Sequence, residues 1–328
     1  MQGMADGFGI LRQEAEIIMR EKTLEILKNA KEWKAPEVSA DIPHGDMPGD
    51  KVEIGEEHIR KSQIIMQELI RLLPEYIEKN GKVVIAVCGG SGVGKSENAS
   101  LISYYLNEMG IGAYTMSGDN YPRRIPMYND AERLQTFRLH GVRALVKNDL
   151  LDEKVREELR GLQKKDDDAN TAYSKEYPWF QTYLDGALAG LRGYLGTRAE
   201  IDFDEVSEII SQFKSGKEKI FLKRMGRTPE ELWYEKVDFS KIDVLVVEWT
   251  HGNSDFIAGV DIPVFLNSTP EETMAHRAAR NRDGKVDSAF TTRVLEIEQA
   301  MLAAQAHKAK VILSKQGELL SYEQYQEL

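Results

Sequence analysis

The chain has 328 residues, of which 41% are hydrophobic and 30% are charged. This ordinary composition excludes a wholly disordered chain and a collagen-like or coiled-coil fibre. The 43 Lys and Arg residues are outnumbered by 54 Asp and Glu residues, so the net charge is −11. A general nucleic-acid-binding role is therefore excluded, because neutralising phosphates needs clustered basic side chains.

A single cysteine, Cys88, rules out an intrachain disulfide and fits a reducing compartment. No apolar run approaches the 18 residues of a membrane span, so we expect no membrane partner. The first 30 residues lack the apolar core and cleavage site of a signal peptide. Together these features predict a cytoplasmic protein.

The chain begins with a segment of helical pattern. Residues 10–34 place apolar side chains at helical spacing between charged ones. A loop rich in Pro and Gly follows over 35–49, and a second helix is expected over 57–73, kinked or restarted by Pro74. We expect residues 1–78 to form an N-terminal helical extension. Its first helix could pack on its own core or pair with another copy, which leaves a homo-oligomer open.

Short, continuous apolar runs then alternate with helical patterns. Such runs are typical of strands buried on both faces, and their alternation with helices predicts an α/β fold with a parallel sheet flanked by helices. The expected strands are 83–88, 113–116, 244–247, 261–266 and 311–313, in a core formed by residues 79–126 and 201–328. Residues 127–200 show no clear strand, and we expect an inserted helical lobe there.

The strongest motif lies between the first expected strand and the helix after it. It fits G-x-x-x-x-G-K-[ST], which predicts a P-loop NTPase-type sheet and a nucleotide-binding loop. Backbone N–H groups and the helix N-terminus hold phosphates, Lys95 places its charge on the β- and γ-phosphates, and the Ser96 hydroxyl is a magnesium ligand. The loop consists of Gly89, Gly90, Ser91, Gly92, Val93, Gly94, Lys95 and Ser96.

Polar residues follow the second expected strand, where a parallel sheet opens onto its ligand crevice. Asp119 could take the proton of an attacking hydroxyl, and it is the candidate catalytic base. Tyr121, Arg123 and Arg124 are candidates for substrate binding, the arginines by holding an anionic group. The alternative for Asp119 and Asn120 is a turn with side-chain-to-backbone hydrogen bonds.

Another acid follows the apolar run at 244–247. Glu248 is placed for a carboxylate beside the magnesium ion and its waters, and its alternative is an exposed acid at a strand end. His251 could contact the substrate or orient Glu248, although a lone histidine is more often a structural hydrogen-bonding residue.

Three arginines lie near the end of a further predicted helix. Thr269, Pro270 and Glu272 form a helix-start pattern that supports this helix. Arginines there could close over the phosphates and stabilise the charge that phosphoryl transfer spreads over the oxygens. The candidates are Arg277, Arg280 and Arg282, and the alternative is a solvated basic face.

These signals in this order resemble the uridine kinase and phosphoribulokinase group of P-loop kinases. The stretch 248–252 is similar to that group's E-G-[LI]-H-G motif, with Trp249 in place of a glycine. The resemblance implies ATP, magnesium, a carboxylate base at Asp119 and an arginine lid. It also places Lys223 and Arg224 in the substrate-loop region.

The resulting hypothesis is a magnesium-dependent kinase that transfers the γ-phosphoryl group of ATP to a small-molecule hydroxyl, of a nucleoside, a sugar phosphate or a similar compound. Residues 118–120 are also similar to part of the G-D-N-x-R motif of adenylyl-sulfate kinases, which is the alternative enzyme. A switch GTPase would need an N-K-x-D loop, and the chain has no Asn-Lys pair. A non-catalytic nucleotide-binding regulator is a further alternative.

Overall fold

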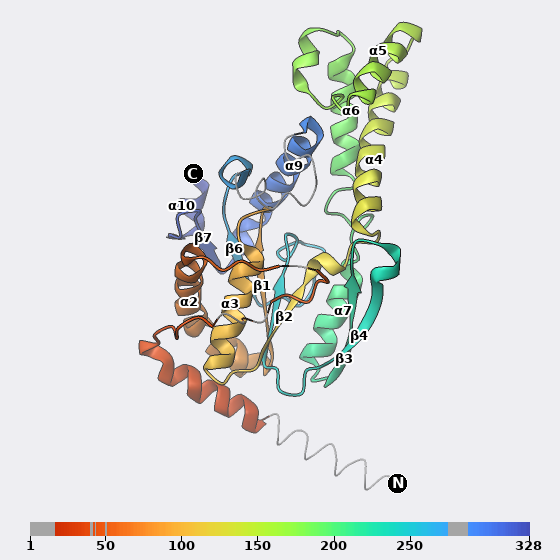
Figure 1. The fold of residues 1–328 in the computed structure, drawn as a ribbon. Helices are drawn as coiled ribbons and strands as arrows, with labels where there is room; N and C mark the ends of the chain where they lie inside the picture. The colour runs from red at the N-terminus through yellow and green to blue at the C-terminus, as the bar shows by residue number, and fades with distance from the viewer. Residues whose placement is uncertain (1–16, 40–41, 43, 50, 275–287) are drawn as a thin grey trace, which may run out of the picture.

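The computed structural model describes residues 17–39, 42, 44–49, 51–274 and 288–328. Its main element is a six-stranded sheet in the order β2-β5-β1-β6-β7-β8, parallel except for the last pair (Figure 1). The predicted α/β class is confirmed. The strands are β1 (Val83–Gly89), β2 (Ala113–Ser117), β5 (Val244–Glu248), β6 (Ile262–Leu266), β7 (Val311–Leu313) and β8 (Leu319–Leu320).

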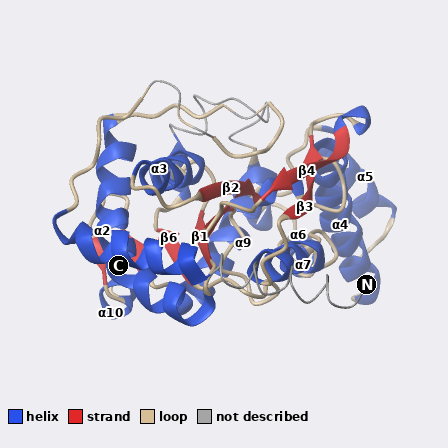
Figure 2. Cartoon of the chain, turned by 90° about the horizontal axis from the view of Figure 1, so that it is seen from below, coloured by secondary structure: helices blue, strands red, loops and turns tan. Residues whose placement is uncertain are grey.

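Helices cover both faces of this sheet (Figure 2). Alternate residues of β1 face opposite sides of the sheet. Ile85 packs in one apolar cluster with α2 (Glu56–Asn80) and α3 (Lys95–Glu108). Val84 packs on the other face with α7 (Phe203–Lys214). Cys88 joins a third cluster with α9 (Ala289–Gln305), and α10 (Tyr322–Gln326) follows the sheet at its far edge. Every residue of β1, β5 and β6 is buried, as their unbroken apolar runs require.

The N-terminal part contains a helical stretch over 17–29 and the longer helix α2. Pro74 lies inside α2, which continues as one helix to Asn80. The expected end of the extension at residue 78 therefore falls within a helix. Leu69 and Leu73 of α2 are fully buried in the same cluster as β1, so α2 covers the sheet directly.

Residues 126–192 form a helical projection from the sheet (Figure 1). Its long helices are α4 (Pro126–Lys147) and α6 (Phe180–Arg192), which pack closely. Gly190 permits this approach, because a Cβ at that position would lie 2.4 Å from the Cβ of His140. The shorter α5 (Glu153–Lys164) and η3 (Thr171–Lys175) lie between them in sequence. The aromatic residues of this lobe gather in a local apolar core.

An antiparallel hairpin was not predicted. It consists of β3 (Lys219–Met225) and β4 (Leu232–Asp238), which pair residue by residue from Lys219–Asp238 to Met225–Leu232. The expectation that Lys223 and Arg224 lie in a loop is wrong, since both belong to β3. Charged residues throughout the hairpin hide the alternation that would have indicated strands.

None of the helices in the described part of the chain combines the length and apolar character needed to cross a membrane.

Candidate active site

The P-loop connects β1 to α3 at the carboxyl edge of the sheet. Gly94 has a φ of +93°, a conformation that side-chain-bearing residues rarely adopt. A Cβ there would also meet the imidazole of His58, a residue of α2, at 3.0 Å. The Lys95 ammonium donates a hydrogen bond of 3.0 Å to the carbonyl oxygen of Gly90. The lysine at the end of the loop is thus hydrogen-bonded to the backbone near the start of the loop.

Glu248 lies at the end of β5, in register with Ser117 of β2 and Val87 of β1. Its two carboxylate oxygens accept hydrogen bonds from the hydroxyls of Ser96, at 3.1 Å, and Ser117, at 3.2 Å. The residue is only 3% exposed. The parallel register therefore brings Glu248 directly to the P-loop serine.

The pair formed by Ser96 and Glu248 offers hard oxygen donors, which magnesium prefers. Among the described residues there is no group of three or more His, Cys, Asp or Glu side chains that could hold a metal ion. Magnesium in nucleotide sites takes one or two protein oxygens and completes its shell with water and phosphate oxygens. The donor set fits such an ion, with Ser96 and Glu248 as the residues that would hold it directly or through water.

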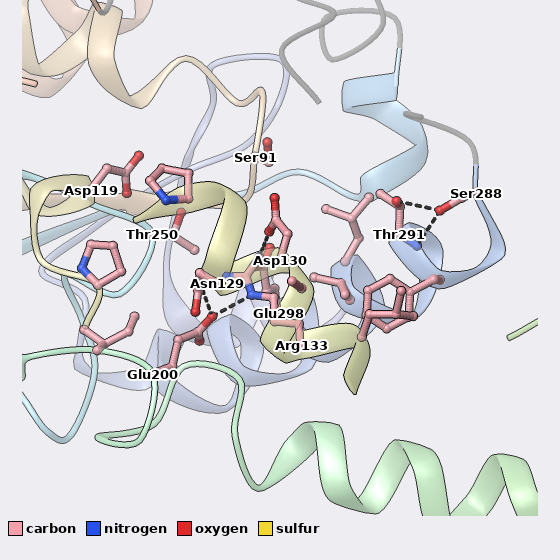
Figure 3. A pocket seen from close by; sticks show the side chains of 18 of the residues that line it. Ser91, Asp119, Asn129, Asp130, Arg133, Glu200, Thr250, Ser288, Thr291 and Glu298 are labelled. Carbon is pink, nitrogen blue, oxygen red and sulfur yellow. Dashed lines mark hydrogen bonds and ion pairs between the residues drawn. The ribbon is translucent and has the colours of Figure 1, made fainter. Parts of the chain in front are cut away.

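Beside the P-loop lies a cavity of about 600 Å³ at the base of the lobe (Figure 3). Ser91 and Asp119 line it on the side of the sheet, and Thr291 and Glu298 line it from α9. Asp119 is exposed to this space. A phosphate on the P-loop and an acceptor in the cavity would therefore both lie near the Asp119 carboxylate.

A buried acid shapes one wall of the cavity. Glu200 is fully buried and accepts hydrogen bonds from the Asn129 amide at 2.8 Å, the Arg133 Nε at 2.6 Å and the Gly196 N–H at 2.6 Å. Glu298 lies nearby, and burial raises the pKa of its carboxyl, with Arg133 acting in the opposite direction. This wall of the cavity thus contains the carboxyl groups of two acids and a positively charged guanidinium, as well as the neutral amide of Asn129.

His251 also lines the cavity. Burial lowers the pKa of its imidazole to about 4, so the ring is neutral at physiological pH. Its neighbour Trp249 is 2% exposed and packs against Phe203, with ring centroids 5.2 Å apart. A Cβ on Gly118 would lie 2.0 Å from the Trp249 ring, so the glycine in the β2 turn makes room for this tryptophan.

Three predicted substrate residues lie away from the cavity lining. Tyr121 is fully buried in the apolar cluster beneath the sheet, so the expectation that it binds substrate is wrong in this structure. Arg123 donates to the Arg198 carbonyl and pairs with Asp202 at 2.9 Å. Arg124 hydrogen-bonds the Tyr194 hydroxyl at 3.2 Å. Both arginines fasten the segment between α6 and α7.

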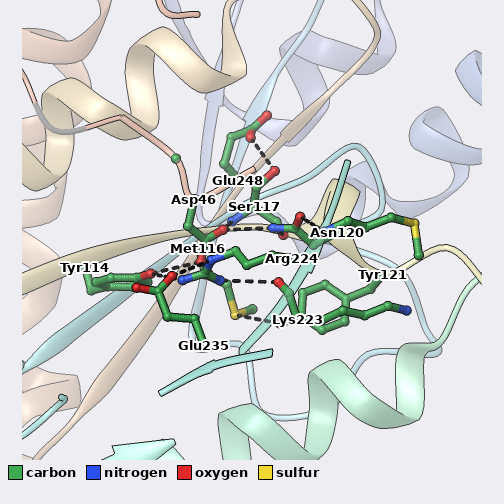
Figure 4. A network of polar contacts seen from close by, with 12 residues as sticks. Asp46, Tyr114, Met116, Ser117, Asn120, Tyr121, Lys223, Arg224, Glu235 and Glu248 are labelled. Carbon is green, nitrogen blue, oxygen red and sulfur yellow. Dashed lines mark hydrogen bonds and ion pairs between the residues drawn. The ribbon is translucent and has the colours of Figure 1, made fainter. Parts of the chain in front are cut away.

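Lys223 and Arg224 have structural partners as well. The Lys223 ammonium donates to the Pro122 carbonyl at 3.3 Å. Arg224 is 4% exposed and pairs with the buried side chain of Asp46 and with the exposed side chain of Glu235 (Figure 4). Neither side chain lines the cavity. The three lid candidates, Arg277, Arg280 and Arg282, lie outside the described residues.

The sequence interpretation missed the wall residues Asn129, Arg133, Glu200 and Glu298. Asn129 and Arg133 are four residues apart on α4 and so share a helix face, which is the one local signal available. Glu200 and Glu298 are separated from α4 and from each other by long stretches of sequence. No motif joins them, and only the fold brings them to one wall.

No protein-family model matches the chain. The bifunctional alpha-galactosidase/sucrose kinase AgaSK of Mediterraneibacter gnavus is 40% identical over 243 residues, which is 74% of this chain and 21% of that protein. The chain thus spans about a fifth of the length of the curated relative that it matches. This similarity confirms the predicted resemblance to kinases of small molecules.

Solved structures give weaker similarities. A putative fructose transport system kinase from Silicibacter sp. is 16% identical, with a TM-score of 0.42 over 76% of this chain and 96% of that one. Phosphoribulokinase from Rhodobacter spheroides is 13% identical, with a TM-score of 0.42 over 71% and 70%. A D-glycerate 3-kinase from Cryptococcus neoformans is 12% identical, with a TM-score of 0.44 over 82% and 99%.

Proposed function

We propose that the chain is an ATP-dependent kinase that phosphorylates a hydroxyl group of a small molecule, with magnesium as the metal. The observation that carries this proposal is the arrangement at the carboxyl edge of the sheet. Glu248 is hydrogen-bonded to the P-loop Ser96, and Asp119 lines the cavity that opens beside the same loop. A nucleotide-binding regulator would have no need of an acid exposed at that point.

In the proposed reaction the acceptor hydroxyl attacks the γ-phosphorus in line, and Asp119 takes its proton. The bond from the γ-phosphorus to the bridging oxygen breaks, and ADP leaves with that oxygen. Lys95 holds the β- and γ-phosphates, and magnesium, when bound, neutralises charge on their oxygens. We also propose that Arg277, Arg280 and Arg282 cover the transferring group.

The cavity favours an uncharged, hydroxyl-rich acceptor. Its two arginines are already paired, Arg133 with Glu200 and Arg138 with Asp168 at 2.7 Å. Among the described residues that line this wall, a phosphorylated acceptor would meet no unpaired cation. We therefore propose a carbohydrate, which agrees with the sucrose kinase in the name of the relative from Mediterraneibacter gnavus. The charged lining residues are Asp119, Asp130, Arg133, Arg138, Asp166, Asp168, Glu200 and Glu298.

The test is ADP release by the purified chain with ATP, magnesium and a panel of acceptors. The panel contains sucrose, fructose, glucose, uridine, ribulose 5-phosphate, glycerate and adenylyl sulfate. We expect turnover with one or more of the unphosphorylated sugars. Turnover with adenylyl sulfate alone would instead support the alternative enzyme.

The matched variant is Asp119→Asn, which keeps the size of the side chain and removes the base. We expect transfer to the sugar to fall by about 10²- to 10⁴-fold, the usual contribution of a general base. ATP binding, measured by calorimetry, should be unchanged. A variant that transfers at the wild-type rate would exclude Asp119 as the base.

A further inference from the structure

The loop before α2 reaches the proposed active site from a distant part of the sequence. A Cβ on Gly45 would lie 3.7 Å from the Cβ of Ser117 and 3.9 Å from the Oε2 of Glu248. Met47, two residues further on, lines the cavity. The backbone at residues 45–47 therefore lies directly against the end of β2 and the magnesium-site carboxylate.

Asp46, between these two residues, is buried with its side chain 8% exposed. Its Oδ1 accepts hydrogen bonds from the Ser117 N–H at 2.8 Å and the Asn120 side-chain amide at 3.0 Å. Its Oδ2 accepts from the Tyr114 hydroxyl and the Arg224 guanidinium, both at 2.9 Å (Figure 4). One carboxylate thus joins β2, the turn η2 (Gly118–Asn120) and β3.

A buried carboxylate is stable only when charge and hydrogen bonds compensate its loss of water. Burial raises the pKa of the Asp46 carboxyl, and its hydrogen bonds and the guanidinium of Arg224 act in the opposite direction. Arg224 is itself nearly inaccessible and donates to the Tyr114 oxygen at 3.1 Å. The side chains of Asp46, Tyr114 and Arg224 thus hydrogen-bond one another, so a change at Asp46 alters the contacts of both partners.

Two further sets of hydrogen bonds connect this network to the proposed reacting groups. The Ser117 hydroxyl donates to Glu248, which accepts the Ser96 hydroxyl on its other oxygen. The Asn120 amide oxygen accepts the backbone N–H of Met225 at 2.9 Å, which fixes the turn against β3. Asp119 lies between the two anchored residues of that turn, so its carboxylate follows any shift of Ser117 or Asn120.

We propose that Asp46 is a positioning residue that fixes the turn carrying Asp119, and that the segment 45–47 is part of the active site. Asp46 does not line the cavity, so it acts through Ser117 and Asn120 rather than on the substrate. The proposal rests on the proposed kinase function for its consequence in turnover. Its geometric part, the fixing of the turn, stands independently of that function.

The test compares Asp46→Asn with the wild type in two measurements. Amide hydrogen exchange over residues 113–121 should become faster by about tenfold or more in the variant. The kcat for sugar phosphorylation should fall by about 10- to 100-fold, since a displacement of about 1 Å at a reacting group has effects of this size. The KM for ATP should stay within about twofold.

Two further variants keep the test decisive. Glu235→Gln removes the negative charge that faces Arg224. The Glu235 side chain is 59% accessible, so this variant should leave kcat and exchange unchanged. Tyr114→Phe removes one donor to Asp46 and should shift both measurements in the direction of Asp46→Asn, by a smaller amount. It serves in place of Asp46→Asn if that variant does not fold.

The outcomes separate this proposal from the proposed function. Absence of turnover in the wild type would overturn the kinase assignment, and exchange would still decide whether Asp46 fixes the turn. Wild-type exchange over residues 113–121 in both Asp46→Asn and Tyr114→Phe would overturn the positioning role. A lower melting temperature with unchanged kcat would show that Asp46 is only structural, which also contradicts it.

Discussion

The Lys95 ammonium lies at the mouth of the P-loop, where it contacts the Gly90 carbonyl. Lys95→Ala removes a charge that the proposed reaction needs on the β- and γ-phosphates. We expect kcat/KM to fall by about 10³-fold, or ~4 kcal/mol, as for loss of one strong electrostatic contact in a transition state. Steady-state ADP release checks this value.

Circular dichroism of the Lys95→Ala variant should match the wild type, because the side chain contributes little to the apolar core. A variant with full turnover would contradict the nucleotide assignment of the loop.

His251 gives a prediction on pH. Its imidazole has a folded-state pKa of about 4, whereas a histidine in the unfolded chain titrates near its ordinary value of 6.5. Below pH 6.5 the unfolded chain binds the proton more readily, so stability falls as the pH drops from about 6.5 to about 4. His251→Gln should lose less stability over this range.

Urea unfolding at pH 7.5 and at pH 4.5 measures this difference. The free energies of unfolding of the wild type and of His251→Gln should differ less at pH 4.5 than at pH 7.5, or their order should reverse. An equal gap at both values would show that the ring is charged or solvated in the folded protein.

At the scale of single residues, the sequence carries a signal where a motif occupies consecutive positions. Residues 89–96 and Asp119 carry their signal in a short stretch, and Glu248 is marked by the strand that it ends. The expectation for Tyr121 was wrong because the sequence after the second strand does not show which way its ring points. Its ring turns instead into the core with Phe203 and Ile201.

At the scale of elements, α4 and the segment before α7 are joined by the ion pair of Arg133 and Glu200. The side chain of Glu200 has no exposed surface, and that of Arg133 is 20% exposed. Arg133→Met leaves a buried carboxylate without its charge partner. We expect a loss of about 3–5 kcal/mol in the free energy of unfolding, measured in urea.

The matched control is Arg123→Met. Arg123 pairs with Asp202, and the two side chains are 39% and 26% exposed, respectively. We therefore expect the free energy of unfolding to fall by less than about 1 kcal/mol. Adding Glu200→Gln to Arg133→Met should restore part of the stability. Equal losses in the two single variants would contradict the buried character of the Glu200 wall.

Elements with unbroken apolar runs were predicted well, because such runs permit few alternatives. The expected strand at 244–247 corresponds to β5, and the strand at 311–313 corresponds to β7. The hairpin of β3 and β4 was missed for a physical reason. Nearly all of β4 is exposed, so its stability comes from pairing with β3 and leaves no apolar pattern to read.

At the scale of the whole molecule, the lobe contributes one wall of the cavity, and its apolar core also includes Val294 and Ile297 of α9. We predict that replacing residues 150–176 by a short Gly-Ser linker raises the KM for the proposed sugar acceptor by about tenfold or more. Asp166 and Asp168 would be lost from the lining, while the P-loop is untouched. The KM for ATP should change by less than about twofold.

Initial rates at varied sugar and ATP concentrations measure the two KM values separately and so check this prediction. An unchanged KM for the sugar would assign the lobe to docking or self-association, and substrate choice would then rest on the sheet edge and α9.

The general architecture followed from the sequence because strand and helix patterns alternate along the chain. The arrangement around the cavity did not, since it depends on contacts between residues as distant as Asp46 and Arg224. Local patterns specify which way a strand or helix is buried. They contain no information on which distant loop fills the space beside it.

The position of β5 between β1 and β2 has a consequence for synthesis on the ribosome. The strands β1 and β2 are made early, yet the strand that separates them emerges only after residue 244. Until then a nascent chain carries two apolar strands with open edges, which favours association with chaperones. Both helices of the α4 and α6 pair precede β5 in the sequence, so they can pack together during this delay, and we expect the lobe to fold before the sheet is complete.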